Sequence, residues 1–209
     1  MVAWQSTGQD GSFDGVFGRR FDSSGGALGA EFQVNQLTTS TQYRPTISHD
    51  SSGGFVVVWQ SFGQDGDYYG VFVRRFDSSG SALGPEFQVN QYTTSYQRFP
   101  TISHDSFGGF VVAWDSYGQD GSSYGVFGRR FDSSGSAVGG EFQVNQFTTG
   151  NQYDATISQD SFGGFVVAWQ SNGQDGSGYG VFARRISAPI VTTGPGPGGA
   201  SLVRRHQRG

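Results

Sequence analysis

Three segments of the chain place a tyrosine a few residues after a glutamine and an aspartate. An aromatic ring can stack on the apolar face of a pyranose, and planar amide or carboxylate groups can hydrogen-bond its neighbouring hydroxyls. The segments therefore offer candidate ligand-binding residues for a sugar. The three sets are Gln64, Asp65 and Tyr69; Gln119, Asp120 and Tyr124; and Gln174, Asp175 and Tyr179. Several weak sites on one face would gain affinity through multivalency.

The aspartates of these sets have a structural alternative. Each lies in a constant Gly-Gln-Asp-Gly segment, and Asp-Gly is typical of tight turns. This context favours turn capping for the aspartates, so the tyrosines are the sharper candidates.

The spacing of oxygen-bearing residues bears on calcium binding. The segment Asp10-x-Ser12-x-Asp14 matches the opening half of an EF-hand loop, but loop position twelve holds Phe21 in place of glutamate. An EF-hand is excluded, and no cofactor is expected. Another kind of calcium site remains an alternative, with its metal ligands unknown.

Catalysis finds little support in the residue pattern. His49 and His104 occupy equivalent positions, where the next copy has Gln159, and a residue replaceable by glutamine is a poor general base. A glycosidase needs two carboxyl groups about 5–9.5 Å apart in one cleft. Asp67, Asp115 and Asp154 are candidate acids that each occur in one copy alone. We therefore expect no catalytic residues and no enzyme.

A repeat of 55 residues organises the chain. Trp4, Trp59, Trp114 and Trp169 recur at this spacing, and residues 2–187 hold about three and a half nearly identical copies. Repeats of this kind indicate one supersecondary unit that is stacked or arranged in a ring.

Each copy is predicted to form four short strands. In one copy these strands are residues 45–48, 55–59, 71–76 and 87–90. Turns rich in Gly, Asp and Ser separate them. We expect an all-β β-propeller built from four-stranded repeats, with four blades. The first blade would lack its first strand and the last its fourth; residues 187–192 resemble a first strand that could close the ring. An open repeat array, a β-solenoid and two chains sharing one ring are the alternatives.

The copies differ most in two kinds of loop that open on the same face of a propeller. One kind holds the tyrosines named above; the other precedes the first strand of a blade, at residues 41–44, 96–99 and 151–154. Loops on a rigid scaffold carry function, so recognition is expected on this face. Neutral drift on a solvent face is the alternative.

Composition limits the class of protein. Hydrophobic residues make up 34% and aromatics 15%, with 35 glycines and no cysteine, which suits short strands and many turns. A net charge of -4 argues against nucleic acid as a partner, and the absence of a long apolar run argues against membrane insertion. Residues 1–193 are expected to form the repeat domain, and 194–209 a Gly/Pro linker with a basic disordered tail.

The pattern Gly-Gly-Phe-Val-Val-x-Trp-x-Ser, followed by Gly-Val-Phe-x-Arg-Arg-Phe-Asp and Glu-Phe-Gln-Val-Asn, resembles a repeat of large bacterial extracellular proteins of the RTX type and of adhesins. The resemblance covers residues 2–187 and implies β-propeller-like modules in an exported, non-catalytic recognition or scaffold protein. It implies a secreted or cell-surface location, although no signal peptide follows Met1. The calcium-binding nonapeptide of RTX proteins is missing.

The sequence thus predicts a multivalent, lectin-like module that binds glycans or cell-surface polysaccharide. The alternative is a structural, self-assembling module without a small ligand, which would form homo-oligomers through open blade edges.

Overall fold

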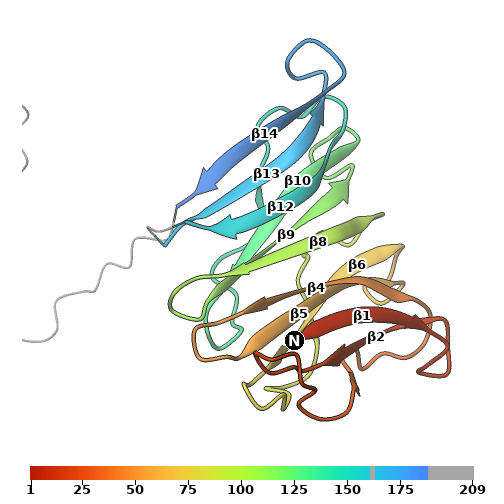
Figure 1. Cartoon of the computed structure of the whole chain (residues 1–209). Helices are drawn as coiled ribbons and strands as arrows, with labels where there is room; N and C mark the ends of the chain where they lie inside the picture. Colours follow the sequence, from red (N-terminus) through yellow and green to blue (C-terminus); the bar gives the residue numbers. More distant parts are fainter. Residues whose placement is uncertain (161–162, 188–209) are drawn as a thin grey trace, which may run out of the picture.

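The computed structural model describes residues 1–160 and 163–187, and every element in this part is a β-strand (Figure 1). The strands form four antiparallel sheets in chain order. The first sheet holds β1 (Val2–Thr7), β2 (Asp14–Arg19) and β3 (Phe32–Gln33). The second holds β4 (Gln42–His49), β5 (Phe55–Phe62), β6 (Tyr69–Phe76) and β7 (Phe87–Gln88). The third holds β8 (Gln97–His104), β9 (Phe110–Tyr117), β10 (Tyr124–Phe131) and β11 (Phe142–Gln143). The fourth holds β12 (Gln152–Gln159), β13 (Phe165–Asn172) and β14 (Tyr179–Ile186).

Tight turns join the strands as the Gly, Asp and Ser pattern predicts. In the turn between β4 and β5, the Asp50 carboxylate accepts hydrogen bonds from the N–H groups of Ser52 (2.8 Å) and Gly54 (2.9 Å). Gly53 has a φ of 86°, which a residue with a side chain rarely adopts. The same aspartate arrangement recurs at Asp105 in the third sheet. These local contacts fix the hairpins independently of the rest of the fold.

The core lies between the sheets, because each sheet is apolar on both sides. Successive strand residues point to opposite faces. One face, which we call the valine side, packs on the next sheet; in the second sheet it consists of Val56, Val58, Val71, Val73 and Val89. The other face, which we call the aromatic side, packs on the preceding sheet; in the third sheet it includes Phe110, Val112, Trp114, Phe127 and Phe131. The same pairing occurs between the first and second sheets and between the third and fourth.

One arginine in each later sheet adds a hydrogen bond across this junction. The Nη1 group of Arg74 donates to the carbonyl of Val34 at 2.9 Å. Arg129 and Arg184 make the same bond, to the carbonyls of Val89 (2.8 Å) and Val144 (3.0 Å). Three junctions therefore share one design, both in their apolar contacts and in this polar contact.

The predicted all-β propeller-like fold with four repeated sheets is confirmed. Two strand lengths differ from expectation: the first strand of each repeat runs for eight residues through an irregularity, and the fourth pairs over only two. Of residues 187–192, which are expected to close the ring, 188–192 lie outside the described part, as do the predicted linker and tail. The first and fourth sheets lie at opposite ends of the stack (Figure 1). The described part holds no helix that is long and apolar enough to cross a membrane.

Candidate functional site

The inner strands β4, β8 and β12 pack side by side, and each carries the same irregularity near its start. The pairing register with the next strand shifts between Tyr43 and Thr46 in β4, and at the equivalent places in β8 and β12. Inside each shift one residue has a positive φ: Arg44 (55°), Phe99 (52°) and Asp154 (54°). These residues are 55 positions apart. A left-handed conformation costs a residue with a side chain roughly 1–2 kcal/mol, and such strain is concentrated at functional sites.

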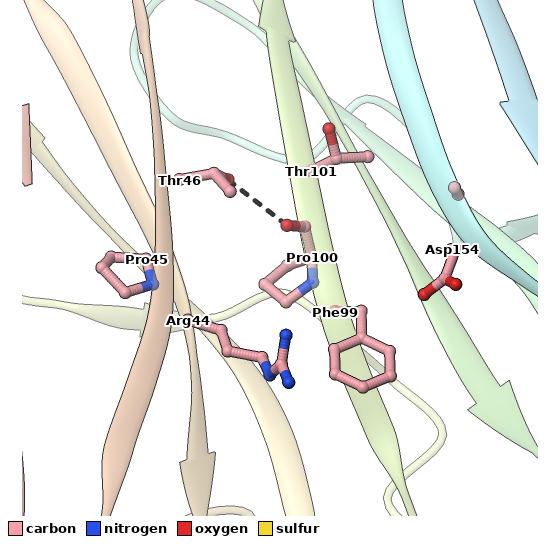
Figure 2. A pocket seen from close by; sticks show the side chains of 8 residues that line it. Arg44, Pro45, Thr46, Phe99, Pro100, Thr101 and Asp154 are labelled. Atoms are coloured by element: carbon pink, nitrogen blue, oxygen red, sulfur yellow. Dashed lines mark hydrogen bonds between the residues drawn. The ribbon is translucent and has the colours of Figure 1, made fainter. Parts of the chain in front are cut away.

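The three strained residues line one pocket of about 420 Å³, together with Pro45, Pro100 and other residues of the inner strands. In Figure 2, Arg44, Phe99 and Asp154 stand in a row on three neighbouring strands. The guanidinium and the carboxylate turn toward the ring from its two sides. Near-identical repeats thus supply a cation, an aromatic ring and a carboxylate to a single cavity.

A side chain from the preceding sheet holds each strained backbone in place. The N–H of Arg44 donates to Oε1 of Gln5 at 3.1 Å, and that of Phe99 to Oε1 of Gln60 at 2.9 Å. The third junction differs, because the N–H of Asp154 donates to Oδ2 of Asp115 at 3.2 Å. The bulges are therefore set by contacts between sheets.

Asp115 is the exceptional member of this set. Its side chain is fully buried, its Oδ1 atom has no hydrogen-bond partner, and the equivalent residues elsewhere are Gln5, Gln60 and Gln170. Burial raises the pKa of Asp115 to about 8, although the backbone N–H of Asp154 acts in the opposite direction. The Asp115 carboxyl group therefore holds its proton at neutral pH, directly beneath the exposed Asp154.

Arginine side chains flank the ring at the centre of the pocket. The guanidinium carbon of Arg44 lies 4.4 Å from the centroid of Phe99, and that of Arg98 lies 4.6 Å from it. Arg98 also lies 3.9 Å from the ring centroid of Tyr124. Cations over aromatic faces are attracted by the ring quadrupole, so these contacts order the side chains around the pocket.

The structure places four of the predicted residues, Gln64, Asp65, Gln119 and Asp120, in contacts with the outer part of their own repeat, whereas Asp175 accepts from the N–H of Ser177 within its turn. Nε2 of Gln64 donates to Oε1 of Glu86 at 2.7 Å, and Oδ2 of Asp65 accepts from Asn90 at 3.0 Å. Gln119 and Asp120 make the equivalent bonds, to Glu141 and Asn145. These contacts tie the outer strand to its sheet. The aspartates also accept hydrogen bonds inside their turns, Asp65 from the N–H of Asp67 (3.4 Å) and Asp120 from that of Ser122 (3.1 Å), as turn capping requires. Sugar binding by Gln64, Asp65, Gln119, Asp120, Gln174 and Asp175 stays a prediction.

The predicted tyrosines lie beside the residue that precedes each strained position. Tyr69 packs edge-on against Tyr43 at 5.4 Å between centroids, and Tyr179 packs against Tyr153 at 5.8 Å. Tyr124 meets Arg98, which precedes Phe99. Two sets of loops that are far apart in each repeat thus meet at the same end of the sheets. Ligand binding by the tyrosines also stays a prediction.

The sequence named the segments 41–44, 96–99 and 151–154 as variable and singled out Asp154 as an acid of one copy, but it did not identify the equivalent positions Arg44 and Phe99. The sequence does contain a signal that could have identified these positions. Gln42, Gln97 and Gln152 are identical in the three repeats, whereas the residue two places later changes from Arg to Phe to Asp. No group of three or more His, Asp or Glu side chains that could hold a metal occurs in residues 1–160 and 163–187. A calcium site remains untested.

The strain at Arg44 leads to a prediction about stability. Replacing Arg44 with glycine relieves the left-handed conformation, and Arg44 is exposed, so little packing is lost. We expect R44G to be as stable as the wild type or more stable by up to about 1 kcal/mol. Urea unfolding measures this. A clear loss of stability in R44G would show that the Arg44 side chain supports the fold, and R44A, which keeps the strain, serves as the control.

Comparisons with known proteins bear on the fold. No family model matches the chain, and no curated protein sequence is similar to it. Solved structures are similar: an α-L-arabinanase from Penicillium chrysogenum, complexed with arabinobiose, has a TM-score of 0.56 and 14% identity over 87% of this chain and 55% of its own. An endo-arabinase from Bacteroides thetaiotaomicron has a TM-score of 0.50 and 13% identity over 85% of this chain and 67% of its own.

These comparisons confirm the propeller-like part of the predicted resemblance, but they contain nothing specific to RTX-type repeats or adhesins. They also correct one prediction. The expectation that the chain is not an enzyme is contradicted, because the structures that share its fold include glycoside hydrolases. At such low identity the likeness establishes the fold alone. The chain has the propeller-like architecture found in proteins that act on carbohydrates, and it spans roughly half to two thirds of their length.

Proposed function

We propose that the chain binds carbohydrate in the pocket lined by Arg44, Phe99 and Asp154. One observation carries this proposal: three nearly identical repeats differ in residue type at the one strained position that faces the shared pocket. Neutral sequence drift on a solvent-exposed face, the alternative explanation, does not account for a strained backbone at all three positions. The arabinobiose in the similar Penicillium structure supports a sugar as the ligand class.

Each residue supplies one part of sugar recognition. The Arg44 guanidinium can donate two parallel hydrogen bonds to neighbouring hydroxyls or to a sugar carboxylate. The exposed Asp154 carboxylate can accept from a pair of hydroxyls, and the Phe99 ring offers an apolar contact. A volume of about 420 Å³ lies within the range of small-molecule sites. We further propose that Tyr69, Tyr124 and Tyr179 extend this site outward. The tyrosines would then contribute to one shared binding site, where the sequence predicted several separate weak sites.

Calorimetric titration with arabinobiose and with short xylan and arabinan fragments tests the proposal. Loss of a charged hydrogen-bonding group costs about 1.5–3 kcal/mol, so D154N should weaken binding at least about tenfold. F99A should weaken it as well. The matched control is F107A, because Phe107 is an exposed phenylalanine in the turn between β8 and β9, at the other end of the sheets. Equal affinity in wild type, D154N and F99A would contradict the assignment of the pocket.

Glycoside hydrolysis is the second candidate, and the pair Asp115 and Asp154 favours it. Two neighbouring carboxyl groups, one of them with a pKa raised by burial, form the arrangement that a glycosidase uses for acid and base or nucleophile. Asp115 is fully buried beneath Asp154 and would have to become accessible before it could protonate a glycosidic oxygen. Hydrolysis by this pair predicts new reducing ends from arabinan or xylan, lost in both D115N and D154N. Activity that survives D154N would place catalysis elsewhere.

We also propose, from the repeat pattern, that the ligand is an extracellular or cell-surface polysaccharide and that the protein is exported. Fractionation of the source cells would test this. Recovery of the protein in the cytosol alone would contradict it.

A further inference from the structure

The two ends of the stack of sheets expose opposite halves of the same junction. Val181, on the valine side of the fourth sheet, is 79% exposed, whereas its equivalents Val16, Val71 and Val126 are fully buried. Val166 is 38% exposed, whereas its equivalents in the second and third sheets are buried. Among the described residues, nothing covers this valine side as the following sheet does in the other three repeats.

Part of the aromatic side of the first sheet is exposed as well, although Phe17 on that side is buried. Val2 is 52% exposed and Phe21 37%, although their equivalents in each of the next two sheets, such as Val57 and Phe76, are buried. Trp4 is half-buried, whereas Trp59 is fully buried at the corresponding place. The residue types that pack against a valine side are therefore present and uncovered at the other end of the chain.

We infer that two copies of this chain associate head to tail, with the aromatic side of one first sheet packed on the valine side of the other copy's fourth sheet. Three junctions inside the chain already show this pairing between nearly identical sequences. The proposed contact between two copies uses the same two kinds of face as these internal junctions. Because the repeats are nearly identical in sequence, the two faces are expected to fit each other in the same way.

A polar contact fits the same arrangement. In the three internal junctions an arginine of the later sheet donates to a carbonyl of the earlier one. Arg19 is the equivalent residue in the first sheet, and its Nε group donates to the carbonyl of Gly29, in the segment between β2 and β3. Its side chain is placed to approach a second copy as Arg74 approaches the first sheet.

The contact is heterologous, because each copy uses two different faces. Such a contact produces a ring if the rotation closes and a filament if it does not. In either case the association can continue beyond two copies, since every added copy brings one uncovered face of each kind.

Sedimentation equilibrium tests this inference over a series of protein concentrations up to about 100 µM. Proteins that share an interface of ordinary size associate within this concentration range. The wild type should show an average mass of at least twice the 22.4 kDa of one chain. V181D and V2D, each with a charge on one face, should both fall to 22.4 kDa. Both sites are exposed, so the far-ultraviolet circular dichroism should be unchanged. F107D is the matched control and should associate like the wild type.

Mixing the two variants distinguishes this pairing from others. V181D keeps an intact aromatic side and V2D an intact valine side, so an equimolar mixture should form a dimer of twice 22.4 kDa that grows no further. Three results would overturn the inference: a monomeric wild type throughout the series, association of V2D alone, or an equimolar mixture that stays monomeric. Association of V2D alone would indicate that two valine sides pair with each other.

Discussion

Replacing Asp115 with glutamine is expected to stabilise the fold by several kcal/mol at pH 8 and by little at pH 4. The pKa of Asp115 is raised to about 8 in the folded state, from the ordinary value near 3.8. The folded protein therefore binds more protons than the unfolded chain between these two pH values. The protonated Asp115 carboxyl group makes its full contribution to the free energy of unfolding below pH 4. This contribution falls as the pH rises and is lost by about pH 8. A shift of this size corresponds to roughly 6 kcal/mol.

The repeat supplies the replacement residue. Gln60 occupies the equivalent place, is buried, and accepts a hydrogen bond from the N–H of Phe99 as Asp115 does from that of Asp154. Glutamine at position 115 should keep this bond without burying a titratable carboxyl. Urea unfolding at pH 5 and pH 8 measures the effect: the wild type should lose stability between them, and D115Q should lose far less.

A control separates this effect from the general response to pH. Asp67 also occurs in a single copy, but it is exposed and its carboxylate accepts from the N–H of Ser95. D67Q should retain the pH dependence of the wild type. If the wild type is equally stable at pH 5 and pH 8, the carboxyl of Asp115 is solvated and its assigned state is wrong.

Replacing Trp114 with alanine (W114A) is expected to lower the free energy of unfolding by about 3–5 kcal/mol, the usual range for a buried tryptophan replaced by alanine. Trp114 is fully buried between the second and third sheets, among Val58, Val71 and other core residues. Its loss leaves a cavity at the junction that holds the middle of the stack together. The midpoint of urea unfolding should fall sharply, with the dependence on urea concentration unchanged.

Trp4 provides the matched comparison, because it occupies the same place in the repeat but is only half-buried. W4A should cost clearly less than W114A when both are measured at a concentration low enough to keep the chains apart. Equal costs would mean that the first sheet is as well covered as the third, which contradicts the exposed aromatic side.

Much of the fold follows from local patterns in the sequence. The 55-residue period and the Asp-Ser-Ser-Gly turns predict antiparallel sheets, because the hairpins are specified within each repeat. The exposure of a residue is not specified in this way. Val71 and Val181 have nearly the same neighbours in sequence, yet one is buried and the other exposed, because burial depends on the neighbouring sheet.

The candidate site depends on contacts of the same long-range kind. The left-handed backbone at Phe99 is held by Gln60, 39 residues earlier and in another sheet. Spacing along the chain gives no sign of this bulge. Asp115 and Asp154 stand out in the sequence as acids that break the repeat, but their proximity and the burial of Asp115 require the packed sheets. The tyrosine loops were assigned to the correct end of the sheets, since alternation fixes which loops share a face.

The most direct measurement of the central claim is a glycan array probed with the wild type, D154N and F107A, once with calcium and once with a chelator. Recognition in the pocket lined by Arg44, Phe99 and Asp154 predicts that the wild type and F107A bind the same coherent set of sugars. D154N should bind that set far more weakly, and a loss on chelation would assign a role to calcium. A blank array for the wild type in both buffers, or equal binding by D154N, would contradict carbohydrate recognition by Arg44, Phe99 and Asp154.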